Sequence, residues 1–186
     1  MENASKALIM VGGILIGILI LTIAVVLFRS FSDFGHSTYE QVEETKIMEW
    51  NSNYLKFYGN MSTGSNQKNV PIPVTAHDIV SMANHAMQNN INYGFEGIEE
   101  ADNPSSYYVQ VVVNGINGYE NFESRLVNRE NFLKNYSQKA DANGIVSPIY
   151  FKMSAVKISD ITKRVYYVEF QEYTDKEYEI YKDIAE

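Results

Sequence analysis

The feature that most constrains this chain is an apolar run of 22 residues near its start, ALIMVGGILIGILILTIAVVLF at positions 7–28. It carries no charged side chain and lies between Lys6 and Arg29. A bilayer core of about 30 Å is crossed by about 20 helical residues, so the run predicts one membrane-spanning helix. A cleaved signal peptide is the competing interpretation, with Ser30 and Ser32 as small residues for processing. Its apolar core is usually only about 7–15 residues long, which favours a retained anchor.

Glycines interrupt the apolar run although glycine weakens a helix. Gly13 and Gly17 are four residues apart and therefore share one helical face, and Ala24 follows two turns later on the same face. Small residues in this spacing let two helix backbones approach closely, and such packing drives helix association in lipid. We therefore expect Gly13, Gly17 and Ala24 to form a helix-association surface. The alternative is that the spacing is accidental, because glycine is common in membrane helices.

Charges around the run leave its orientation nearly undetermined. Lys6 and the amino terminus precede the run, and Arg29 and then Lys46 follow it, so the two sides are almost balanced. The head is short, whereas the long remainder is acidic and rich in Asn and Tyr. These features favour a cell-membrane protein that spans the bilayer once, with its C-terminal domain outside the cytoplasm.

Composition restricts the partners and chemistry of the rest of the chain. The 186 residues carry a net charge of −8 and show no basic stripe, so binding of a nucleic acid is not expected. The complete lack of cysteine excludes disulfides, cysteine-based zinc sites and a cysteine nucleophile. The partners that we expect are therefore the lipid bilayer and, through the helix, further copies of the chain or other membrane proteins.

The pattern of apolar residues divides the chain into four parts. Residues 1–28 form the head and anchor, 29–59 an amphipathic helix that continues from it, 60–174 an α+β domain, and 175–186 an acidic tail, either a solvated helix or disordered. The apolar residues of the second part recur at intervals near three and four. They are Tyr39, Val42, Ile47, Trp50, Tyr54 and Phe57.

Within the α+β domain, local signals place the main elements. Residues 59–69 are polar and predict a loop, and Thr75 with Asp78 resembles a capping box at the start of a helix over 76–89. The run YYVQVVV at 107–113 predicts a strand, and two alternating runs at 149–158 and 164–172 predict a β-hairpin. A broken helical segment between them carries Phe122, Leu126, Phe132, Leu133 and Tyr136. The fold class is therefore α+β: a long N-terminal helix with a small antiparallel sheet and two packed helices.

Motifs that carry chemistry are weak in this sequence. His77 and His85 are eight apart, whereas a zinc-binding helix needs two histidines four apart. The segment GNMSTGS at 59–65 has Ser65 where a phosphate loop needs lysine, and its Ser62 is in the wrong register for a nucleophile elbow. We therefore predict no catalytic, cofactor or metal residues, and a protein that is not an enzyme.

Two acidic segments could supply oxygen ligands for calcium. The first is the cluster Glu96, Glu99, Glu100 and Asp102, and the second is Asp141 to Gly144. Neither has the twelve-residue spacing with a terminal glutamate that a calcium loop requires, so solvated charge is the preferred interpretation.

Tyrosine is frequent, with 14 in the chain. Tyrosine rings bury well while keeping a polar tip in water, and protein interfaces favour them. The alternative is that they simply occupy strand faces. Those outside the first helices include Tyr107, Tyr108, Tyr119, Tyr150, Tyr166, Tyr167, Tyr173, Tyr178 and Tyr181.

The opening MENASKALIMVGGILIGILIL resembles that of a group of single-pass membrane proteins of low-GC Gram-positive bacteria that share an ENASKAL-type head, and the segment VTAHDIV at 74–80 resembles it loosely. The resemblance implies membrane topology and no activity. More broadly, the layout is similar to type IV pilins and pseudopilins, which carry an apolar, then amphipathic N-terminal helix capped by an antiparallel sheet. Pilins have a glutamate inside the apolar run, whereas here the nearest acid is Glu2, outside it.

These observations lead to one functional expectation and two alternatives. We expect a membrane-anchored, non-enzymatic surface protein, a pilin-like structural or assembly subunit that associates through its N-terminal helix. The first alternative is a monomeric, membrane-tethered binding module for a cell-surface ligand or protein. The second is a tethered hydrolase, which requires a deep pocket with two carboxylates of shifted acidity.

Overall fold

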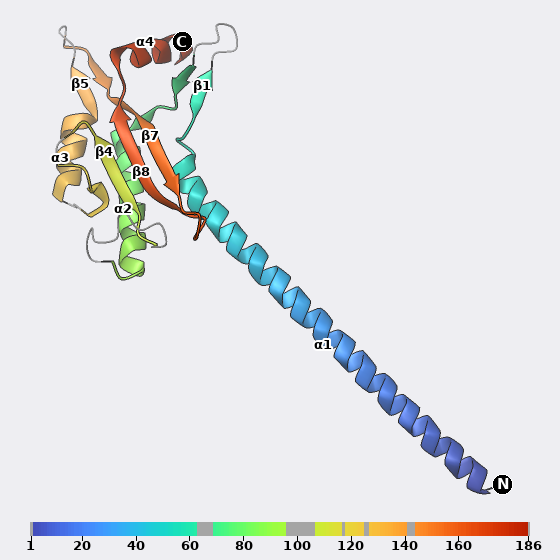
Figure 1. Ribbon diagram of the computed structural model, residues 1–186. Coiled ribbons are helices and arrows are strands. Elements are labelled where there is room, and N and C mark those ends of the chain that lie inside the picture. The colour runs from blue at the N-terminus through green and yellow to red at the C-terminus, as the bar shows by residue number, and fades with distance from the viewer. Residues whose placement is uncertain are drawn as a thin grey trace. The chain divides into compact units, whose positions relative to one another are not determined.

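The computed structural model of the protein describes residues 2–62, 69–95, 107–116, 118–124, 127–140 and 144–185 (Figure 1). The chain divides into two compact units, Met1–Lys46 and Ile47–Glu186. Its helices are α1 (Glu2–Leu55), α2 (Ala76–Asn92), the 3-10 turn η1 (Phe122–Ser124), α3 (Val127–Tyr136) and α4 (Asp175–Ala185). Its strands are β1 (Asn60–Ser62), β2 (Asn69–Pro71), β3 (Val74–Thr75), β4 (Gln110–Asn114), β5 (Gln138–Ala140), β6 (Val146–Pro148), β7 (Tyr150–Ile158) and β8 (Val165–Glu172).

The first unit is helical throughout its described residues, because α1 runs without interruption from Glu2 through Gly35. Gly35 lies within this helix and does not interrupt it. The large apolar side chains of residues 8–34 are exposed, from Leu8 at 78% to Phe34 at 70%. This helix is the long apolar N-terminal helix that the sequence predicts.

A four-stranded sheet organises the second unit, with the strand order β3-β7-β8-β4. The predicted hairpin is confirmed: β7 and β8 are antiparallel, with Phe151 opposite Glu172 and Ile158 opposite Val165. β3 is antiparallel to β7, whereas β4 runs parallel to β8, with Gln110 opposite Tyr167. The α+β class and its layout are thus as predicted, and the parallel β4–β8 pair adds a detail that local pattern does not contain.

Helix α2 begins where the sequence places it. Thr75 accepts a hydrogen bond from the Asp78 amide at 3.2 Å, and the Asp78 carboxylate accepts one from the Thr75 amide at 3.0 Å. This capping box satisfies amide groups that have no partner inside the helix. One face of α2 is buried in the core, including Ile79, Met82, Ala83 and Ala86.

Two short strand pairs were not predicted. β1 pairs with β2, so the prediction that residues 59–69 are a loop is wrong at both described ends of that segment. Pro71 closes β2 at the end of a two-stranded pair, a position where its missing amide donor is tolerated. β5 pairs with β6 in the same antiparallel manner, and the tail forms the helix α4.

One hydrophobic core joins the end of α1, α2, η1, α3 and the four-stranded sheet. Its aromatic centre is formed by rings from η1, α3 and β7, with Phe122 and Phe132 at 4.9 Å and Phe132 and Phe151 at 5.7 Å between centroids. Tyr54, in the last turns of α1, is completely buried in the same core. The end of α1 from Ile47 onward is therefore a structural part of the second unit.

Candidate functional site

The apolar stretch of α1 is the first candidate. α1 contains a segment that is long and apolar enough to cross a membrane, and none of that segment is buried within the protein. Signal sequences near an N-terminus meet the same condition. The predicted candidate for a single membrane span is therefore present.

Gly13, Gly17 and Ala24 lie within this exposed stretch. A Cβ atom added at Gly13 or Gly17 meets nothing within 4 Å, so packing inside a single chain does not require glycine at either position. On an ideal helix of about 3.6 residues per turn, the three small residues share one face within about 40°. The helix-association surface stays a prediction.

The last turns of α1 are bound to the turn between β7 and β8. The Asn51 side chain donates to the Lys163 carbonyl at 2.8 Å and accepts from the Val165 amide at 2.8 Å, so it pairs with the backbone as a strand would. The Trp50 indole donates to the Val165 carbonyl at 3.2 Å. The Arg164 guanidinium lies 4.0 Å from the Trp50 ring centroid, in a cation–π contact.

Tyr54 and His85 form the polar edge of this junction. The Tyr54 hydroxyl and His85 Nδ1 are 3.0 Å apart, and the His85 ring lies 4.9 Å from the Trp50 ring. Burial raises the pKa of Tyr54 well above its ordinary value. Burial also lowers the pKa of His85, and the positive charges of Arg164 and Lys56 lower it further. The arrangement holds a neutral imidazole beside a neutral phenol.

Glu123 is a completely buried carboxylate. It accepts from the Tyr108 hydroxyl at 2.6 Å and from the Val111 amide at 2.8 Å. Burial raises its pKa, although these hydrogen bonds and the charge of Arg129 oppose that change. Arg129 donates to the Glu123 carbonyl at 2.7 Å and also to Asn84. Because the Glu123 carboxylate is bonded to Tyr108 and to the edge of β4, its role is structural.

A pocket of about 230 Å³ lies where α4 meets β5, β6 and the ends of β7 and β8. Three tyrosines line it, and its charged groups are two lysines and two carboxylates. They are Tyr150, Tyr173 and Tyr178, Lys139 and Lys182, and Glu172 and Asp175. The remaining lining comes from small and apolar residues of β5, β6 and the start of β7.

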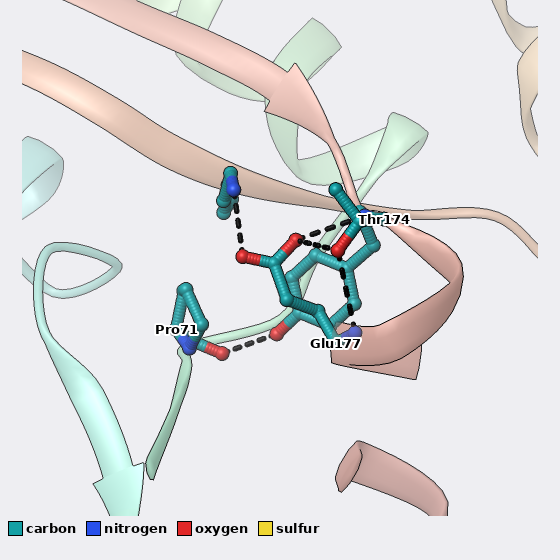
Figure 2. A network of polar contacts seen from close by, with 5 residues as sticks. Pro71, Thr174 and Glu177 are labelled. Atoms are coloured by element: carbon teal, nitrogen blue, oxygen red, sulfur yellow. Dashed lines mark hydrogen bonds and ion pairs between the residues drawn. The ribbon is translucent and has the colours of Figure 1, made fainter. Parts of the chain in front are cut away.

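Figure 2 shows how α4 is attached beside this pocket. The Glu177 carboxylate accepts from the Thr174 amide at 2.8 Å, and the Thr174 hydroxyl accepts from the Glu177 amide at 3.3 Å, which is a second capping box. Lys152 of β7 forms an ion pair with Glu177 at 2.6 Å. The Tyr173 hydroxyl donates to the Pro71 carbonyl of β2 (Figure 2). The start of α4 is thus held by its own capping box, by β7 through Lys152 and, through the preceding Tyr173, by β2.

Among the described residues, the structure does not bring together the candidate metal ligands that the sequence suggested. His77 and His85 both lie on α2, where His77 is exposed and His85 contacts Tyr54. The acidic cluster at 96–102 and residues 141–143 lie outside the described residues. Among the residues that the structure describes, no group of three or more acidic or histidine side chains could hold a metal ion.

Sequence reasoning missed Glu123, the Arg164 junction and the pocket, because each is assembled from distant segments. A weak signal for the pocket was present in the tail, where Tyr178 and Lys182 are four residues apart on one helical face. Comparison with protein-family models, with curated proteins and with solved structures found no match. The functional proposals therefore rest on the sequence and on the geometry of the structure.

Proposed function

We propose that this protein is a single-pass, membrane-anchored structural subunit, pilin-like in layout, that associates with further copies through α1. The observation that carries the proposal is the contrast within this one helix. Its apolar stretch leaves large side chains exposed, whereas its last turns from Ile47 are bound into the core of the second unit. An exposed apolar surface of this length matches a lipid environment.

The association surface that we propose consists of Gly13, Gly17 and Ala24. The absence of any acid between Lys6 and Arg29 distinguishes this helix from that of type IV pilins. Association here therefore relies on close backbone packing, which glycine and alanine permit, and not on a charge in the membrane.

A cysteine cross-linking experiment tests this surface. Because the chain has no native cysteine, only the introduced thiol can form a disulfide. Gly13→Cys places a thiol on the proposed face. Leu15→Cys places it about 200° around the same helix at nearly the same depth, and so serves as the matched control. We expect an oxidant to convert the Gly13→Cys protein in native membranes to a disulfide-linked dimer, and to leave the Leu15→Cys protein monomeric.

Equal cross-linking of the two variants, or none in either, contradicts association through this face. A second arm uses Gly17→Leu, whose side chain keeps the backbones apart. We expect this substitution to abolish the Gly13→Cys dimer in the double variant, while the protein remains in the membrane.

The proposal places the second unit outside the cytoplasm, as the short head and the acidic domain favour. Protease added to intact cells tests this orientation. We expect loss of the second unit from intact cells, with a small protected fragment that contains the apolar stretch. Protection of the whole chain until the cells are opened contradicts this orientation.

One observation favours a second candidate function, a monomeric membrane-tethered binding module. It is the tyrosine-lined pocket beside α4, because concave sites with a few convergent polar groups are where proteins bind small ligands. The cross-linking experiment separates the two candidates, since a monomeric module gives no dimer.

A further inference from the structure

The pocket beside α4 has walls from three separated segments. Tyr178 and Lys182 come from α4, Tyr150 from β7 and Tyr173 from the position after β8, and Lys139 from β5. The Tyr150 ring lies 6.0 Å from that of Tyr178 and 6.1 Å from that of Tyr173, so the three aromatic side chains form one group. A ligand in this pocket would meet aromatic rings and charged groups together.

The pocket is held in place before any ligand arrives. The capping box of Thr174 and Glu177 and the ion pair of Glu177 with Lys152 hold the first turn of α4, as Figure 2 shows. Lys152 and Glu177 are only 19% and 20% exposed, so solvent screens their ion pair less than it screens a surface pair. Tyr173 is bound through its amide to the Tyr150 carbonyl at 2.9 Å. Preorganised walls lower the cost of ordering a site on binding.

Charge and size narrow the ligand class. Two lysines face two carboxylates, so the lining as a whole offers no net charge to select a strongly anionic or cationic ligand. It offers both donors and acceptors, which suits a ligand rich in hydroxyl groups. The volume of about 230 Å³ lies below the roughly 300–1,000 Å³ of sites for drug-sized molecules. A single small ring fits this volume.

Sugars combine these properties. A pyranose ring presents an apolar face of C–H groups, which packs on an aromatic ring, and a rim of hydroxyls, which bond to carboxylates and ammonium groups. Tyrosine supplies a rigid apolar surface with a polar tip. Lys182 lies 4.8 Å from the Tyr178 ring centroid, so a charged donor already stands next to an aromatic surface.

We infer that the pocket formed by α4, β5, β6 and the ends of β7 and β8 binds one neutral sugar residue. Tyr150 and Tyr178 supply the aromatic surface, and Lys139, Lys182, Glu172 and Asp175 bond to the hydroxyl rim. The inference goes beyond assembly through α1 and does not depend on it, because the pocket belongs entirely to the second unit.

Saturation-transfer NMR on the full chain in lipid nanodiscs tests this inference. Nanodiscs avoid detergents with sugar head groups, which would compete for the site. The probes are the methyl glycosides of glucose, galactose and N-acetylglucosamine, with choline as the cationic and methyl phosphate as the anionic comparison, because both carry methyl protons that report the transfer. We expect transfer to ring protons of at least one glycoside and none to choline or methyl phosphate.

Two substitutions locate the binding. Tyr178→Ala removes an aromatic wall and is expected to lower the affinity about three- to tenfold, the equivalent of one aromatic contact. Asp175→Asn removes a charge with little change of shape. It tests whether the Asp175 carboxylate bonds to the sugar hydroxyls, and it leaves the packed rings in place. Tyr39→Ala, on an exposed part of α1, is the matched control and should bind as the parent does.

The inference fails if no glycoside shows transfer, or if only choline or methyl phosphate does. It also fails if Tyr178→Ala and Asp175→Asn, both shown to be folded by thermal melting, bind sugars as tightly as the parent. Neither result bears on the α1 cross-linking, so failure of this inference is distinguishable from failure of the proposed assembly.

Discussion

The two ends of α1 share one backbone conformation but are surrounded differently. Over residues 8–34 the large apolar side chains are more than half exposed, whereas nearer its end Tyr54 is completely buried and Trp50 is half-buried. A helix satisfies its own backbone hydrogen bonds wherever it lies, so only the side chains decide which surroundings suit each end. The first end suits lipid, and the second suits a protein core.

The largest effect is expected where α1 joins the core. Tyr54→Ala removes a completely buried ring and should lower the free energy of unfolding by about 3–5 kcal/mol, as for other large aromatic truncations. Denaturant unfolding of the second unit, followed by the fluorescence of Trp50, measures it. Tyr39→Ala in the exposed part of the same helix should change that free energy by less than about 0.5 kcal/mol. Equal losses of unfolding free energy in the two variants would contradict the view that only the second end of α1 packs in the core.

The converse substitution tests the apolar end. Leu19→Lys places a charge at the middle of the apolar stretch, which costs about 2.5–3.5 kcal/mol for insertion into a membrane. We expect a large shift of the protein from the membrane fraction to the soluble fraction, with unchanged melting of the second unit. Leu19→Ile is the control and should stay in the membrane. Full membrane retention of the lysine variant would argue against a span at this position.

A smaller effect is expected at Glu123, which is completely buried in the second unit. Glu123→Gln replaces an acceptor oxygen by an amide group that faces a donor, so it should cost about 1–3 kcal/mol of stability. Because burial raises the pKa of Glu123 in the folded state, the protein is stabilised most below the ordinary carboxyl pKa and loses that contribution as pH rises through the raised value. Unfolding titrations of parent and variant across this range should differ in slope; parallel curves would exclude Glu123 as the cause.

The smallest effect is expected at His85. Burial, with help from Arg164 and Lys56, lowers its pKa in the folded state. Stability is therefore complete above the ordinary histidine pKa and declines as pH falls from about 6.5 through the lowered value. Thermal melts in that interval should show a decline that His85→Gln reduces, because glutamine carries no titrating charge. An unchanged decline in the variant would assign the pH dependence to another group.

The elements that sequence reasoning placed correctly depend on local signals. The apolar length of α1, the Thr75–Asp78 capping box and the alternating strands of the β7–β8 hairpin are each contained in one short stretch of sequence. In each case the residues that determine the element are neighbours in the chain, so periodicity and capping chemistry are sufficient.

The elements that were missed depend on distant partners. β1 and β2 are strands because they pair with each other, although each has only three residues. Glu123 is an ordinary acidic residue in sequence, and its burial follows from contacts with Tyr108 and β4. The pocket requires α4, β5 and the end of β8 to meet, which no local pattern specifies.

The outer edge of β4 limits how copies of this chain can join. The amide of Val111 is bonded to the Glu123 carboxylate, and that of Val113 to the Tyr119 carbonyl at 2.9 Å. At the other edge β3 covers only the first two residues of β7. The β4 edge, whose outward amides are already bonded, offers little template for an incoming strand. Copies of this chain would thus not join by adding a strand at the β4 edge of the four-stranded sheet.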